Sequence, residues 1–372
     1  MTGVLVEPQE EVVGTCSESI VWIDQVDTAD AVAAAGSKIG RLTELHRAGV
    51  TVPQGFAVTV DAYLRHCAES GLDARIEAAL KDLGPTPSEA EVAAASARIR
   101  ALVEETPMSP ALEAEITEAY EDLCLRAVDV NVPTAVRSSA TGEDAADASF
   151  AGIFDTYLGV SGPDRVLTAV RACWGSLFTG RALAYRLRKG ISHHAMPIAV
   201  GVIELVHARA SGVAFSVHPV TGKPDRIVVE TSWGWGEAIV QGLVDPDHVE
   251  IGKADGRVLR YDVAHKAVVS AFDFAAGRVT EIEMPAKLAD RQVLDEEQIG
   301  AIVEAVTAIE EHYGYPVDVE WVIDRHRRAG DPITIVQSRP VTVTAQQTAP
   351  AAYDPVALAQ KFVFSGKPIP GR

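Results

Sequence analysis

The hydrophobic pattern of this 372-residue chain changes its period near Pro197, and this change constrains the fold more than any other feature. Before it, apolar residues recur mainly at helical spacing, with a few short strand-like runs between them. After it, runs such as GVAFSV and DRIVVETS follow one another at turn-separated intervals, which is typical of an antiparallel sheet. We therefore expect an α/β (α+β) protein with a helix-rich lobe, a sheet-rich lobe and a ligand site between them.

The same pattern predicts the domain organisation. Residues 1–18 are polar and acidic and are expected to form a flexible tail. We expect the first lobe over residues 19–197, with a helical insert at about 73–128, and the second lobe over residues 198–345. Residues 346–372 are interpreted as a linker that ends in either a docking segment or a disordered end.

Composition excludes several classes of function. A net charge of −19 argues against nonspecific binding to nucleic acid or to a membrane surface, because either needs a basic face. No window reaches about 18 uninterrupted apolar residues, and no secretory signal is visible, so we expect a cytoplasmic protein. The scattered cysteines form no CxxC pair and are expected to be reduced thiols. They are Cys16, Cys67, Cys124 and Cys173.

Two cations stand in sequences that suit phosphate binding. Lys38, in AAAGSKIG, follows small residues that let a ligand approach the backbone, although a solvated helix lysine would look the same. Arg137 ends an apolar run, and a buried guanidinium is costly unless it meets an anion. The alternative for Arg137 is an internal salt bridge to Glu143 or Asp144. The stretch after it has no Walker motif.

Two strand-like runs near the end of the second lobe carry a third set of polar residues. In VDVEWVID, Asp318 and Glu320 alternate onto one face, as Gln337 and Arg339 do in TIVQSRPV. Carboxylate and amide oxygens suit Mg²⁺, and an arginine beside them suits a transferring phosphoryl group. The alternative is a structural ion pair between Glu320 and Arg339.

Five motifs follow one another along the chain. They are GSKIGRLTELHRAGVTVPQGFAVT, AVRSSATGEDAADASFAGIFDTYL, SGVAFSVHPVTG, GWGEAIVQGLVDPD and DVEWVID with IVQSRPV. Together they resemble the N-terminal ATP-grasp domain of the pyruvate phosphate dikinase and phosphoenolpyruvate synthase family. The resemblance covers roughly residues 20–345 and is closest in layout to the ATP-binding subunit of phenylphosphate synthase-like enzymes.

The resemblance implies a role for each matching residue. Lys38 and Arg137 would hold the phosphates of ATP, and Arg339 would lie beside the transferred phosphoryl group. Glu320 and Gln337 would bind Mg²⁺. The cover over the phosphates would run from Thr141 to Gly152 and would include Gly142, with Ser138 just before it. The hinge strand that meets adenine would be Ile203–Val206, where the family usually has glutamine in place of Glu204.

The resemblance also implies a partner. Members of the family phosphorylate a histidine on a swivelling domain, with AMP and phosphate as the other products. The motif ISHHAMP at 191–197 superficially fits such a histidine, but it lies within the expected ATP-binding region and no glycine-rich run precedes it. We therefore expect the histidine on a separate subunit or on a missing part of the protein.

The expected function is that of the ATP-binding subunit of a two-component dikinase whose final acceptor is a hydroxyl group, plausibly phenolic. One alternative is the ATP-binding part of a phosphoenolpyruvate synthase or of a rifampicin-type antibiotic phosphotransferase. Another, from a different class, is a non-catalytic nucleotide sensor. The retention of Glu320, Gln337 and Arg339 together speaks against a sensor, which would not need all three.

Overall fold

The computed structural model describes residues 18–25, 29–84, 87–140, 154–192, 196–236, 244–273 and 278–341. The first of its two larger sheets is antiparallel throughout, with the strand order β1-β2-β5-β3-β4. Its strands are β1 (Ile20–Trp22), β2 (Gly55–Val58), β3 (Thr134–Ala140), β4 (Thr156–Val160) and β5 (Ile198–Glu204).

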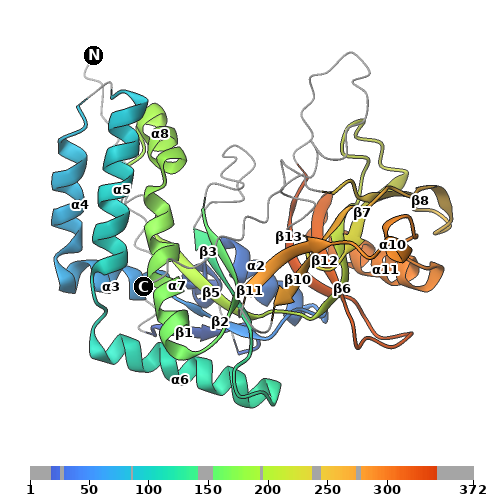
Figure 1. Ribbon diagram of the computed structural model, residues 1–372, viewed down its shortest axis with the longest axis horizontal. Helices are drawn as coiled ribbons and strands as arrows, with labels where there is room; N and C mark the ends of the chain where they lie inside the picture. Colours follow the sequence, from blue (N-terminus) through green and yellow to red (C-terminus); the bar gives the residue numbers. More distant parts are fainter. Residues whose placement is uncertain are drawn as a thin grey trace, which may run out of the picture.

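Most helices of the first lobe gather on one side of this sheet (Figure 1). Local signals fix their ends: Thr59 caps α3, and Ser88 forms a capping box with Glu91 at the start of α5. The large buried side chains of this layer include Trp174, Tyr120 and Phe178. The helices are α1 (Ala29–Ala34), α2 (Gly36–Arg47), α3 (Val60–Ser70), α4 (Leu72–Lys81), α5 (Glu89–Glu105), α6 (Pro110–Ala127), α7 (Pro163–Gly175) and α8 (Gly180–Lys189).

The second large sheet is also antiparallel, with the order β13-β12-β6-β7-β8-β9. Its strands are β6 (Ala208–Phe215), β7 (Arg226–Trp233), β8 (Asp247–Gly252), β9 (Val258–Asp262), β12 (Val317–Asp324) and β13 (Thr334–Pro340). A separate hairpin and a short helix complete this lobe. They are β10 (Val268–Asp273), β11 (Arg278–Glu283) and α10 (Ala286–Ala289).

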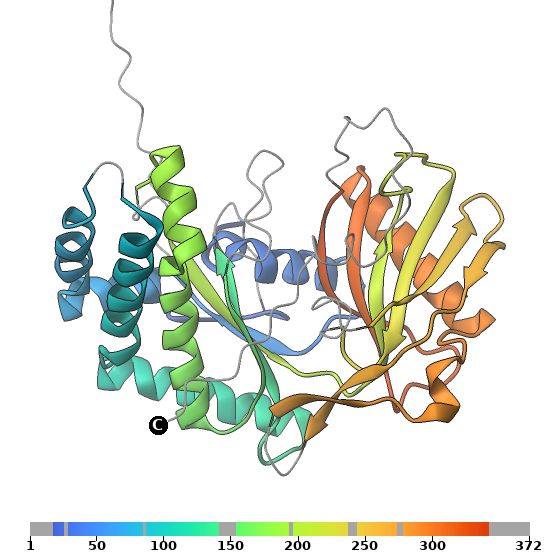
Figure 2. The same ribbon diagram turned by 45° about the horizontal axis from the view of Figure 1, so that its top comes forward.

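Helix α11 (Glu296–Tyr313) packs on the face of the second sheet that is turned away from the first lobe (Figure 2). A capping box between Asp295 and Gln298 starts it, and its buried residues Ile302 and Ile309 join Trp321 of β12 in one core cluster. The sequence DEEQIGAIVEAVTAIEEHYG predicts such a capped amphipathic helix from its apolar spacing, and the structure confirms it. Because α11 covers one face of β12, the alternate residues of that strand face the first lobe.

Strand β5 belongs to the first sheet, although the change in hydrophobic pattern near Pro197 predicted that it would belong to the second lobe. It lies between β2 and β3 and pairs with both. The change from one sheet to the other therefore comes after Glu204, not at Pro197. A strand pattern shows that a segment is extended but does not show which strand it pairs with.

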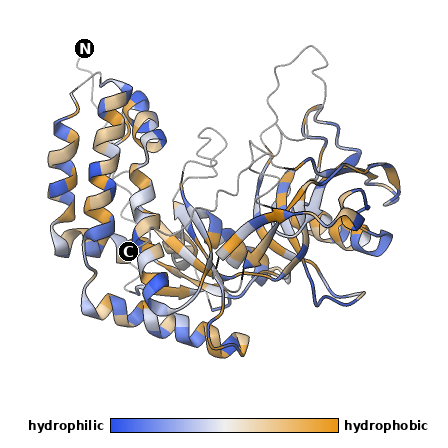
Figure 3. Cartoon of the chain, in the orientation of Figure 1, coloured by the Kyte–Doolittle hydropathy of each residue, from blue (hydrophilic) through white to orange (hydrophobic). Residues whose placement is uncertain are grey.

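Helix α2 connects the two lobes. Its buried Leu45 belongs to the core between the second sheet and α11, whereas Ile39 and Leu42 pack with residues from both sheets. The backbone N–H of Ile335 also donates to the carbonyl of Thr51 at 2.9 Å. Apolar residues (orange in Figure 3) are concentrated where the strands and this helix meet. The expected mixed fold of helices and sheets in two lobes is confirmed, and it is consistent with the ATP-grasp fold that the resemblance implies.

Two expectations from composition can be compared with the described residues. Among them, no helix is sufficiently long and apolar to cross a membrane. Cys67, Cys124 and Cys173 are buried free thiols, as predicted, and Cys16 lies outside the described residues.

Candidate functional site

The site begins with four polar residues on two neighbouring strands. In the β12–β13 register, Asp318 lies opposite Arg339 and Glu320 lies opposite Gln337. All four are buried, with exposed fractions between 1% for the two carboxylates and 9% for Arg339. They share the face that is not covered by α11, so the sheet presents a compact polar cluster toward the first lobe.

Glu320 is the most unusual member of this cluster. Neither of its carboxylate oxygens has a hydrogen-bond partner among the described residues. Burial raises its pKa to about 7, although the charges of Arg339, Arg137 and Lys38 oppose this rise. A buried carboxylate within electrostatic reach of three cations, and without hydrogen bonds of its own, is a ready ligand for a hard cation.

Arg339 is held by Asp318. Its Nε donates to Asp318 Oδ2 at 2.8 Å, across the strand pair. The structural ion pair that we considered between Glu320 and Arg339 is therefore replaced by one between Asp318 and Arg339. This pairing fixes the guanidinium next to Glu320 without occupying the Glu320 carboxylate.

Arg137 extends from β3 of the first sheet to β13 of the second. Its Nη1 donates to the carbonyl of Val336 at 3.0 Å, and its Nη2 donates to the side-chain oxygen of Gln337. The side chain is 4% exposed. The alternative partners, Glu143 and Asp144, lie outside the described residues. Arg137 thus joins the two sheets at the polar cluster.

Lys38 is brought to the same place by the start of α2. Ser37 Oγ donates to the carbonyl of Ala140 at 2.9 Å, and Ile39 N–H donates to Ser139 Oγ at 3.1 Å, so the helix begins against the end of β3. Gly36, with a φ of +72°, makes this possible, because a Cβ there would lie 1.9 Å from the carbonyl oxygen of Ser139. Lys38 is half-buried and close enough to Glu320 to affect its pKa.

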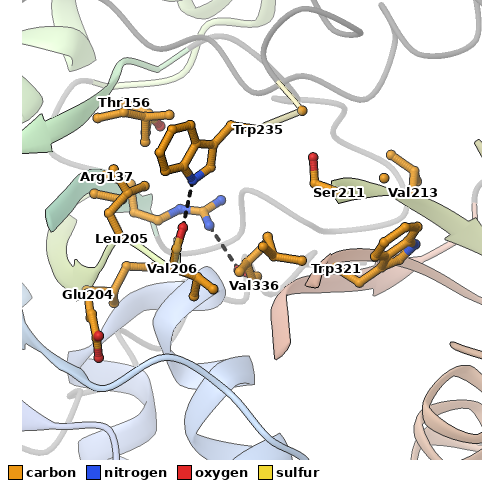
Figure 4. Close-up of a pocket in the computed structure, with 16 residues that line it drawn as sticks. Arg137, Thr156, Glu204, Leu205, Val206, Ser211, Val213, Trp235, Trp321 and Val336 are labelled. Atoms are coloured by element: carbon orange, nitrogen blue, oxygen red, sulfur yellow. Dashed lines mark hydrogen bonds between the residues drawn. The ribbon is translucent and has the colours of Figure 1, made fainter. Parts of the chain in front are cut away.

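The remaining predicted site residues do not all lie at the polar cluster, and some lie outside the described residues. Ser138 is fully buried in β3, next to Arg137. Thr141, Gly142 and Gly152 lie outside the described residues. Glu204 ends β5, and its side chain points away from the opposite sheet (Figure 4). Burial raises the pKa of Glu204.

A pocket between the two sheets extends from Arg137 to the residues after β5, Leu205 and Val206 (Figure 4). Its walls are largely apolar, and Trp235 Nε1 donates to the carbonyl of Val206 at 2.8 Å inside it. Sequence reasoning missed several residues that line this pocket. They are Ala135, Thr156, Leu158, Ser211, Gly212, Trp235, Trp321 and Val322.

The missed residues differ in how they could have been found. Thr156 lies directly opposite Arg137 in the β3–β4 register, so pairing these two strands in the sequence would have indicated it. Trp235 follows the end of β7 and reaches the pocket through tertiary contacts, for which the sequence carries no local signal.

The polar cluster fits a magnesium ion only if the ligand supplies further oxygens. Among the described residues, no group of three or more histidine, cysteine, aspartate or glutamate side chains could hold a metal. Glu320 and Gln337 nevertheless present a carboxylate and an amide oxygen from opposite positions of a strand pair. Mg²⁺ is commonly held by one or two protein oxygens together with water and phosphate oxygens.

Comparison with known proteins agrees with this arrangement. Residues 32–360 match the family model of the pyruvate phosphate dikinase AMP/ATP-binding domain. A probable phosphoenolpyruvate synthase of Methanothermobacter thermautotrophicus is 40% identical over 319 residues, which cover 86% of this chain and 45% of that protein. The phosphoenolpyruvate synthase of Escherichia coli is 37% identical over 343 residues, which cover 89% of this chain and 43% of that protein.

This chain spans less than half the length of these relatives. The family model matches most of the chain, and the matched residues include every member of the polar cluster. The chain therefore belongs to the pyruvate phosphate dikinase AMP/ATP-binding domain family.

Proposed function

We propose that this chain binds Mg·ATP between its two sheets and phosphorylates a histidine on a separate domain or subunit. In this reaction the two terminal phosphates of ATP separate from AMP. One becomes the phosphoryl group on the histidine nitrogen, and the other is transferred to a water molecule and leaves as free phosphate. The phosphohistidine then passes its group to an acceptor hydroxyl.

The observation that carries this proposal is the buried Glu320. A carboxylate that is 1% exposed, has no hydrogen-bond partner within the described part of the chain and lies near three cationic groups is costly to bury unless a ligand completes its environment. Mg·ATP supplies both missing parts, because the cation meets the carboxylate and the phosphates meet the lysine and the arginines.

The resemblance implies a division of roles, and the geometry of the site supports it. Glu320 and Gln337 would hold the magnesium, which neutralises charge on the phosphate oxygens when bound. Lys38 and Arg137 would bind the phosphate chain from the first lobe. Arg339, held in place by Asp318, would stabilise the charge of the phosphoryl group as it transfers.

Cation and nucleotide are expected to bind together. Gln337 already accepts a hydrogen bond from Arg137, so a cation at the amide oxygen would lie beside a guanidinium. A phosphate oxygen can take over the N–H groups of Arg137 and separate the two positive charges. Magnesium alone should therefore bind much more weakly than Mg·ATP.

Two variants test the assignment. We expect Arg339→Ala to lower AMP formation about 100- to 1,000-fold, the usual effect of removing one charge-stabilising donor, while Mg·ATP binding stays within about tenfold. Glu320→Gln should lose both AMP formation and magnesium-dependent binding of ATP. The measurements are AMP release and phosphohistidine formation with a histidine-bearing partner, and calorimetry of Mg·ATP binding.

Arg98→Ala is the matched control, because Arg98 is exposed on α5 and forms an ion pair with the exposed Asp82. It should leave both measurements unchanged. Wild-type AMP formation by Arg339→Ala would contradict the role assigned to Arg339. ATP binding without AMP formation, tested with every candidate partner, would favour a nucleotide sensor instead.

The acceptor is a separate question. The names of the similar proteins favour phosphoenolpyruvate synthesis, with pyruvate as the final acceptor. The resemblance also allows two other acceptors, a phenolic hydroxyl and a rifampicin-type antibiotic. Supplying pyruvate, a phenol and rifampicin in parallel to the chain and its partner would separate the three.

A further inference from the structure

Trp235 lies in the pocket between the sheets, close to where the base of a nucleotide would meet the end of β5. Its ring belongs to an apolar cluster with Ala135 of the first sheet and Val322 and Val336 of the second. The ring also packs edge-on against Phe272 of β10, with 6.4 Å between the ring centroids. The side chain is 6% exposed, so the indole is embedded between the lobes.

The polar groups at the end of β5 leave few choices for a base. The backbone N–H of Glu204 donates to Gln54 and that of Leu205 donates to Pro133, each at 2.8 Å. The carbonyl of Val206 faces the pocket and accepts the indole N–H of Trp235 (Figure 4). A base that enters here therefore meets a carbonyl to which the protein's own side chain already donates.

The space in the pocket leads to the same conclusion. The free cavity is about 50 Å³, which holds only a few water molecules, whereas ligand pockets usually measure about 300–1,000 Å³. A purine ring can enter only if part of the lining moves. Trp235 is large and lies beyond the end of β7, between Gly234, which has a φ of +71°, and Gly236, and its backbone N–H donates to the carbonyl of Ser270 at 3.3 Å. The part of this residue that can move is therefore its indole side chain.

We propose that Trp235 is a gate for the purine base and that it occupies the base subsite until a nucleotide displaces it. This inference rests on the proposed binding of ATP. The indole N–H takes the place of an exocyclic amino group, since both are donors to the carbonyl of Val206. A base with an amino group at that position replaces the lost hydrogen bond, and a base with a carbonyl there does not.

The experiment compares Trp235→Phe and Trp235→Leu with wild type and with Trp233→Phe. Trp233 is the matched control, because it lies two residues earlier, does not line this pocket and donates its indole N–H to Leu288 instead. The readouts are the dissociation constants for Mg·ATP and Mg·ITP, and the quenching of tryptophan fluorescence by acrylamide. Circular dichroism and thermal unfolding check that each variant folds.

We expect Trp235→Phe to bind Mg·ATP about three- to tenfold more tightly, because no indole hydrogen bond has to be broken. Trp235→Leu should bind at least as tightly as Trp235→Phe, and Trp233→Phe should match wild type. In wild type and in Trp233→Phe, but not in Trp235→Phe, ATP should increase the quenching. Mg·ITP should bind more weakly than Mg·ATP in all four proteins.

Unchanged or weaker ATP binding by both Trp235 variants, with wild-type binding intact, would overturn the gate alone. Weaker binding would instead mark Trp235 as a surface on which the base stacks. If none of the four proteins bound Mg·ATP, the proposed function would fail, and the gate with it.

Discussion

Arg137 is the residue on which we expect both the stability and the chemistry of the proposed site to depend. It is buried, it leaves one sheet, and it donates to two acceptors on the other. A lysine at this position cannot reproduce both hydrogen bonds, because an ammonium group is a point charge and a guanidinium is a planar fork.

Arg137→Lys is therefore expected to weaken Mg·ATP binding by about 30-fold or more, the usual effect of truncating a buried, hydrogen-bonded charge. The free energy of unfolding should fall by about 1–3 kcal/mol. Calorimetry and urea unfolding measure the two effects.

The control is Arg186→Lys, another buried arginine, which packs against Phe178 in the first lobe, away from the site. It should lower stability and leave nucleotide affinity unchanged. Equal affinities for wild type and Arg137→Lys would exclude Arg137 from the phosphate site.

At the scale of single strands, β7 and β8 carry a second buried polar group on the face that also bears Glu320. His248 Nδ1 lies 2.8 Å from Glu230 Oε1, and Arg226 donates to Glu250 Oε2 at 2.6 Å. Burial raises the pKa of Glu230 to about 7. Burial alone would lower the pKa of His248, but the hydrogen bond to Glu230 and the nearby carboxylates raise it.

These shifts predict that stability decreases as the pH rises. Both groups bind protons more tightly in the folded state, so their contribution is complete at acidic pH. The contribution of Glu230 is lost between its ordinary pKa of 4.5 and about 7, and that of His248 is lost above 6.5. We expect the free energy of unfolding to fall by about 1–3 kcal/mol from pH 5 to pH 8.

Urea unfolding at several pH values measures how steeply the free energy of unfolding falls with pH, which is the slope of the pH dependence. Glu230→Gln should flatten it, and Glu118→Gln, which changes an exposed glutamate of α6, should not. A slope that is identical in wild type and in Glu230→Gln would show that this pair does not control the pH dependence.

Elements with strong local signals could be predicted from the sequence, and their pairing could not. The capping box at Asp295 and the apolar spacing after it predicted α11, because both signals are contained in one segment. Alternation placed Asp318 and Glu320 on one face of a strand. The register that sets Glu320 opposite Gln337 could not be predicted, because it is followed by an irregularity between Glu320 and Trp321.

At the scale of the whole molecule, the two lobes share their core. Helix α2 contributes Ile39 and Leu42 to a cluster with both sheets and Leu45 to the core beneath α11. The hydroxyl of Tyr313, the last residue of α11, donates to the carboxylate of Glu44 in α2 at 3.1 Å. The lobes should therefore unfold in one transition.

Leu45→Ala tests this coupling. Leu45 is fully buried, so the substitution should lower the free energy of unfolding by about 2–5 kcal/mol and shift one common transition. Differential scanning calorimetry and hydrogen exchange in each lobe measure the effect. Leu125→Ala, at a side chain that is 75% exposed, should change little. Two separate transitions in Leu45→Ala would show that the lobes are independent.

At this scale, contacts between residues far apart in the chain could not be predicted from the sequence. The sequence predicted cations in the first lobe and oxygen ligands in the second, but the hydrogen bond from Arg137 to Gln337 joins residues 200 positions apart. The position of Trp235 in the pocket could not be predicted for the same reason. Its partner, Val206, is identified only once both sheets are folded.

Gly36 has a consequence for the placement of the two cations of the proposed phosphate site. Because this residue has no β-carbon, α2 can begin against the end of β3, and Lys38 comes within electrostatic reach of Glu320, as Arg137 does. Even one methyl group at position 36 would push the helix outward and shift the lysine while leaving every charged residue in place. The smallest residue of this segment therefore works as a spacer, and we expect it to set how far apart two positive charges would stand on one chain of phosphates.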